Sequence, residues 1–139
     1  GGRTVAINLS DGERLWTATE GSGSPVWPVG NAVFLINDLN ELVRLDANSG
    51  NPVWRTALPT FEDGERTSRQ KRVFAHYGPV LAGGRLIVTS SDGLIRQFDP
   101  TSGALIGQVD LPGGAASGPV VAAETLYVLS KNGQLHAFR

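Results

Sequence analysis

Residues 41–54 read Glu-Leu-Val-Arg-Leu-Asp-Ala-Asn-Ser-Gly-Asn-Pro-Val-Trp, and this stretch decides the fold because the chain repeats it. Residues 3–16 follow the same pattern 38 positions earlier, with the glycine and the tryptophan in register. A third copy begins at Leu94 and has Gly107 at the tryptophan position, and a fourth copy, residues 134–139, is cut short. A fixed period of about 40 residues indicates a repeat architecture.

Short apolar and β-branched runs recur between turn formers, and no long window keeps a helical period. They predict thirteen strands, at residues 4–9, 14–19, 26–29, 32–36, 41–45, 52–58, 78–81, 85–90, 94–98, 104–111, 119–122, 125–129 and 134–138. Four strands in each period are typical of a β-propeller blade, whose sheet is buried on both faces by neighbouring blades. We therefore expect an all-β fold of blades with four antiparallel strands, in an incomplete arc of about three to three and a half blades.

The blade boundaries follow from the repeat, because Pro25, Pro79 and Pro119 mark equivalent strand starts. They divide the chain into a partial blade at 1–21, a blade at 22–60, a blade at 61–113 with an inserted loop at 60–77, and an incomplete last blade at 114–139. A closed ring needs at least about four blades, so strand edges at both ends of this arc need partners. Pairing of those edges between two copies would give a homo-oligomer.

The repeated turn has the form Asp-x-x-x-Gly-x-x-x-Trp, and each of its side chains has a structural use. The aspartate can cap amides of the turn, the glycine can adopt a positive φ, and the tryptophan can cover the face of the next blade. The structural repeat residues predicted in this way are Gly12, Trp16, Asp46, Gly50, Trp54, Asp99 and Gly103.

Composition excludes several classes of function. The 139 residues carry 12 Lys and Arg against 13 Asp and Glu, a balance that argues against nucleic-acid binding. The absence of cysteine excludes disulfides, thiolate metal sites and a cysteine nucleophile within this segment. No apolar run reaches the length of a transmembrane segment. The chain opens on a strand-like stretch without a signal peptide, so we expect the natural amino terminus to lie upstream.

The turn Asp-x-x-(Ser/Thr)-Gly-x-x-x-Trp resembles the PQQ-like β-propeller repeat. Residues 31–38, 78–93 and above all 117–139 resemble the carboxyl-terminal portion of the BamB family of outer-membrane assembly lipoproteins. The resemblance implies a non-enzymatic scaffold for protein–protein interaction in the periplasm, associated with the outer membrane. It also implies binding to the outer-membrane barrel insertase, BamA, and a lipid anchor that lies outside this segment.

Two alternatives use the same blades. A fragment of a PQQ-dependent quinoprotein dehydrogenase would need a Ca²⁺ site and a catalytic aspartate near the quinone. The aspartates of this chain sit at repeat or turn positions, so we predict no cofactor. The other alternative is a structural PQQ-like repeat segment of another protein.

The two histidines, His76 and His136, are 60 residues apart and neither has a second ligand at metal-binding spacing. His136 falls in a repeat column of packing residues. We therefore predict neither a metal site nor catalytic residues.

The insertion at residues 60–77 lies outside the repeat register and carries acidic, then basic, then aromatic side chains. Loops free of blade packing often carry binding function, and arginine and aromatic residues are enriched at interface hot spots. The alternative is a solvated loop whose charges neutralise one another. The predicted partner-binding residues are Arg66, Arg69, Arg72, Phe74 and His76.

Overall fold

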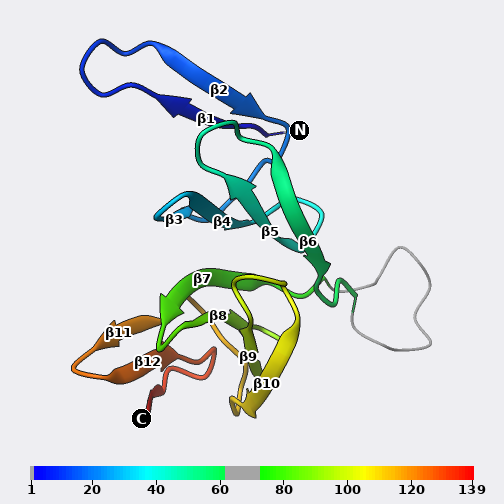
Figure 1. The fold of residues 1–139 in the computed structure, drawn as a ribbon. Coiled ribbons are helices and arrows are strands. Elements are labelled where there is room, and N and C mark those ends of the chain that lie inside the picture. Colours follow the sequence, from blue (N-terminus) through cyan, green and yellow to red (C-terminus); the bar gives the residue numbers. More distant parts are fainter. Residues whose placement is uncertain (1, 62–72) are drawn as a thin grey trace.

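The computed structural model describes residues 2–61 and 73–139, and every regular element within them is a β-strand (Figure 1). The strands are β1 (Thr4–Ile7), β2 (Arg14–Ala18), β3 (Trp27–Val29), β4 (Ala32–Ile36), β5 (Glu41–Asp46), β6 (Pro52–Ala57), β7 (His76–Ala82), β8 (Arg85–Ser90), β9 (Leu94–Phe98), β10 (Leu105–Asp110), β11 (Val120–Ala122), β12 (Thr125–Leu129) and β13 (Leu135–Phe138). The predicted all-β fold of antiparallel blades is confirmed.

The strands form four sheets, and within each sheet strands adjacent in sequence pair antiparallel. The first sheet contains β1 and β2, the second β3–β6, the third β7–β10 and the fourth β11–β13. Figure 1 shows the sheets following one another through the molecule, with the two chain ends at opposite ends. The described sheets therefore form an arc and not a closed ring.

Apolar side chains are buried where consecutive sheets face each other. Phe34 of the second sheet packs in one cluster with Leu86 and Phe98 of the third. A separate cluster joins the first sheet to the second, and another joins the third to the fourth. All five residues of β4 are buried, because the second sheet is covered on both faces. This explains why residues 32–36 form a continuous apolar run instead of an alternating one.

Two strand bounds differ by two residues from those that the sequence predicts, and several others differ by one. The first strand ends at Ile7 instead of residue 9, because Asn8 accepts a hydrogen bond from the Ser10 amide (2.9 Å) and begins the turn. The strand expected at residues 78–81 begins earlier, at His76. The pairing of β7 with β8 shifts register between Tyr77 and Val80, so the strand continues on both sides of this irregularity. Irregular pairing of this kind hides a strand start from pattern reading.

Candidate interaction surfaces

The repeated turn is held together by its aspartate. Asp46 Oδ1 accepts hydrogen bonds from the backbone amides of Asn48 (2.8 Å) and Ser49 (3.1 Å). Asp99 accepts two amide hydrogen bonds in its own turn at the same spacing. These carboxylates therefore act as caps of their turns.

The tryptophans that follow the first two repeated turns each join their sheet to the next one. Trp16 donates its indole N–H to the carbonyl oxygen of Ala47 (2.8 Å), which belongs to the turn after β5. Trp54 donates in the same way to Pro100 (3.2 Å) in the turn after β9. A buried indole needs a partner for its N–H, and here the following blade supplies it.

The glycines of the repeated turns all have positive φ, which is 76° at Gly12, 74° at Gly50 and 76° at Gly103. A Cβ atom at Gly50 would overlap the ring of Trp16. At Gly103 a Cβ would come within 2.6 Å of Trp54 Cε3. Both the backbone conformation and the neighbouring indole therefore require glycine at these two positions.

The insertion leaves and rejoins the blades through a narrow neck. Phe61 and Val73 form an antiparallel bridge, and Phe74 donates its backbone N–H to the carbonyl of Thr60 (2.9 Å). The Phe74 side chain is half-buried at this neck. Three predicted contact residues lie outside the described residues: Arg66, Arg69 and Arg72. Their contact role stays a prediction.

His76 lies beneath the neck and is only 7% exposed. Its Nε2 atom lies 2.6 Å from the carbonyl oxygen of Pro59, so Nε2 carries the hydrogen and donates it. Its Nδ1 atom lies 2.6 Å from Ser90 Oγ and accepts from that hydroxyl. Because both ring nitrogens are occupied and the ring is buried, the structure argues against the predicted partner contact of His76. It fastens the neck to β8 instead.

Burial lowers the pKa of His76 from its ordinary value of 6.5, and the nearby Arg96 guanidinium acts in the same direction. The Pro59 carbonyl and the Asp92 carboxylate oppose this shift without cancelling it. The ring is therefore held in the neutral form that its two hydrogen bonds require.

The Ser90–His76 pair has the spacing of a nucleophile and its base, but substrate has no path to it. Ser90 is 0% exposed and also accepts a hydrogen bond from Arg96 Nη1 (3.1 Å). Asp92, which would complete a triad, forms an ion pair with Arg96. The arrangement is a buried polar network that holds the blade together.

The strands at the outer edges of the first three sheets, β2, β6 and β10, carry exposed aliphatic side chains. Leu15 is 62% exposed, Val53 55% and Ile106 47%. These residues directly precede Trp16, Trp54 and Gly107. Because side chains alternate along a strand, their position in the repeat indicates that they face away from the packed tryptophan side. Open strand edges with apolar side chains are surfaces to which another chain can add.

A second surface feature is a hollow of about 450 Å³ at the start of the first strands of three successive sheets. The prolines that mark the repeat, Pro25, Pro79 and Pro119, line it together with Trp27 and Tyr77. The structure thus brings side by side three prolines that are far apart in sequence.

In residues 2–61 and 73–139, no group of three or more His, Cys, Asp or Glu side chains is arranged to hold a metal ion. Over the same ranges, no helix has the length and apolar character needed to cross a membrane. His136 stacks on Phe138 in β13, with ring centroids 6.3 Å apart.

Comparison with known proteins gives the family. The family model described as outer membrane protein assembly factor BamB matches residues 1–99 and 91–139. The outer membrane protein assembly factor BamB of Shewanella oneidensis is 24% identical over 135 residues, which is 96% of this chain and 31% of that protein. The chain therefore spans about a third of the length of this curated relative.

Two solved structures show the fold. The BamB structure from Moraxella catarrhalis superposes with a TM-score of 0.74 at 24% identity, over 99% of this chain and 43% of that one. The quinohemoprotein alcohol dehydrogenase from Comamonas testosteroni superposes with a TM-score of 0.67 at 15% identity, over 91% and 26%. At these identities each likeness concerns the propeller fold alone.

Proposed function

This chain belongs to the BamB family of outer membrane protein assembly factors, and we propose that it forms part of a β-propeller acting as a non-enzymatic scaffold for protein partners. The observation that supports this proposal most is how the repeat uses its polar residues. Asp46 and Asp99 cap turns, and Ser90 and His76 are hydrogen-bonded to each other in the interior. What remains at the surface is loops and strand edges, which suit binding.

We further propose that the protein works in the periplasm at the outer membrane, with the barrel insertase BamA as its partner. The support is the family itself, whose members are described as outer membrane protein assembly factors. Binding through the insertion would involve Arg66, Arg69, Arg72 and Phe74, while His76 holds the neck in place.

Pull-down of the insertase by the full-length protein tests this proposal. The double variant Arg69→Ala/Arg72→Ala is expected to lower recovery about tenfold, as loss of interface arginines does. The matched control is Arg3→Ala/Arg14→Ala, which removes two exposed arginines from the β1–β2 end. If the first variant kept its melting temperature and recovered the insertase unchanged, the insertion would not be the binding site. Equal loss in both variants would show a general charge effect.

Calorimetric titration with the quinone and Ca²⁺ addresses the enzymatic alternative. The scaffold proposal predicts no saturable heat. Micromolar or tighter binding would overturn it in favour of a dehydrogenase.

A further inference from the structure

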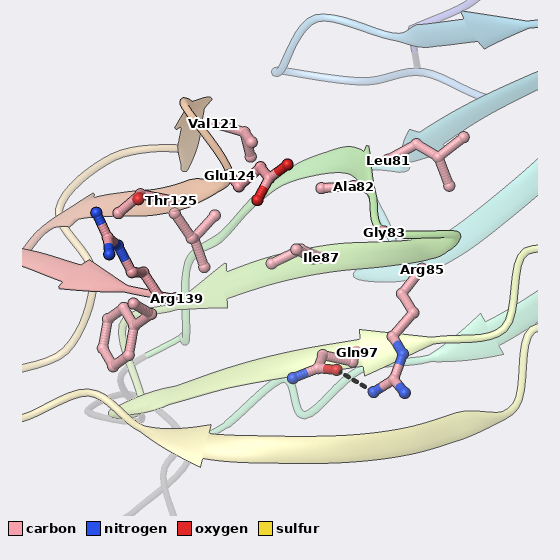
Figure 2. Close-up of a pocket in the computed structure, with 12 residues that line it drawn as sticks. Leu81, Ala82, Gly83, Arg85, Ile87, Gln97, Val121, Glu124, Thr125 and Arg139 are labelled. Carbon is pink, nitrogen blue, oxygen red and sulfur yellow. Dashed lines mark hydrogen bonds between the residues drawn. The ribbon is translucent and has the colours of Figure 1, made fainter.

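An apolar groove of about 710 Å³ separates the third sheet from the fourth. Figure 2 shows it between the hairpin that carries Leu81 and Gly83 and the strand pair that carries Val121 and Thr125. Its volume falls within the range of small-ligand sites. We call it the β8–β12 groove, after two of the strands that line it.

The walls of this groove are the repeat equivalents of the residues around Trp54. The cluster that receives Trp54 includes Ala32, Phe34, Leu81, Leu86 and Phe98. Shifted by one repeat, the positions are Arg85, Ile87, Val121, Leu126 and Phe138, and all five line the groove. The groove is therefore the third copy of a socket that already holds a tryptophan at the preceding interface.

The third copy is open because its own strand has no side chain to fill it. Gly107 on β10 pairs with Gln97 on β9, as Trp54 on β6 pairs with Arg44 on β5. A Cβ atom at Gly107 would find its nearest neighbour, the Gln97 side chain, only at 3.9 Å. Nothing in the described backbone therefore demands glycine here on steric grounds, in contrast to Gly50.

We propose that the β8–β12 groove binds a tryptophan side chain presented by a partner polypeptide. The socket precedent argues for this occupant, since Trp16 and Trp54 fill the equivalent positions at the two earlier interfaces. Polar groups at the rim suit an indole: Gln97 accepts a hydrogen bond from Arg85 Nη1 (2.7 Å), and the Glu124 carboxylate can accept from an indole N–H (Figure 2). The inference deepens the scaffold function on which it rests, because it names a surface and the chemistry of its partner.

The test is titration of the full-length protein with N-acetyl-tryptophanamide, monitored through the chemical shifts of the backbone amides in NMR spectra. Saturable shifts are expected at Leu126 and Phe138. Gly107→Trp places an indole in the groove and should weaken probe binding at least about tenfold while raising the melting temperature. Gln108→Trp is the matched control: it adds the same side chain on the opposite face of β10 and should leave probe binding unchanged.

A second variant guards against misfolding of the first. Val121 is 43% exposed at the groove, so the Val121→Glu variant should fold. It should still weaken binding of the probe, because the glutamate is charged and larger than valine. Absence of saturable shifts, or equal binding by Gly107→Trp and Gln108→Trp, would overturn the inference. Because the readout is a small probe, failure here leaves insertase recovery intact, whereas failure of the scaffold proposal would abolish recovery and leave probe binding.

Discussion

Two consecutive interfaces of the molecule are built from the same repeat positions, and the tryptophan of the first is replaced by a glycine in the second. Between the second and third sheets, Trp54 fills the space between Phe34 and Leu81, with its ring centroid 6.1 Å from that of Phe34. Between the third and fourth sheets, Gly107 leaves that space as a groove. The comparison teaches that the strand pairing of a blade does not depend on the tryptophan, because β10, which has Gly107, pairs with β9 just as β6, which has Trp54, pairs with β5.

The largest expected effect comes from emptying the filled interface. Trp54→Ala should lower the free energy of unfolding by about 3 kcal/mol, since it removes a packed aromatic side chain and leaves a cavity. It would make the second interface resemble the third. Urea denaturation measures the loss. Trp27→Ala, at a residue that is 36% exposed, is the control and should cost less than about 1 kcal/mol. Equal losses in the two variants would refute the importance of the interface.

A matched pair of glycine variants sharpens the comparison. Gly103→Ala should cost about 2 kcal/mol, because its φ is 76° and the new methyl group would collide with Trp54. Gly107→Ala should be close to neutral, because nothing lies nearer than 3.9 Å to the added carbon. Thermal melting of both variants decides the point. A destabilised Gly107→Ala variant would mean that the groove is less open than the structure shows.

The smallest effect concerns pH and the polar network on the Trp54 side of the third sheet. Burial lowers the pKa of His76 below 6.5, so the unfolded chain binds a proton that the folded chain resists. The contribution of His76 to the free energy of unfolding is therefore fully present above about pH 6.5 and declines as the pH falls below that value. Urea midpoints at pH 7.5 and pH 5.5 should show this decline. His76→Gln should flatten it, and an unchanged slope in that variant would assign the pH dependence to other groups.

The repeat was enough to predict the strands and the propeller fold, because local alternation and turn glycines specify each hairpin. It also places Gly107 in the tryptophan column. It does not show that Val121 and Phe138 face that position, because contacts between blades depend on how the sheets stack.

The candidate site was harder to predict than the fold. The aromatic and basic character of the insertion suggested that His76 is a surface residue. Its burial depends on pairing with Ser90 across an irregular stretch of β7, which no local pattern announces. The exposed aliphatic residues of the outer strands are hard to predict for a different reason: apolar residues in a strand usually belong to the core.

The indole hydrogen bonds from Trp16 to Ala47 and from Trp54 to Pro100 run in one direction along the chain, each from a blade to its successor. An emerging polypeptide can therefore complete a blade only after the following turn has been synthesised. In such a stack of blades each sheet is stabilised mainly by contacts with its nearest neighbours. Hydrogen exchange should accordingly be slow in β4, β5, β8 and β9, the central strands of the two sheets that are covered on both faces.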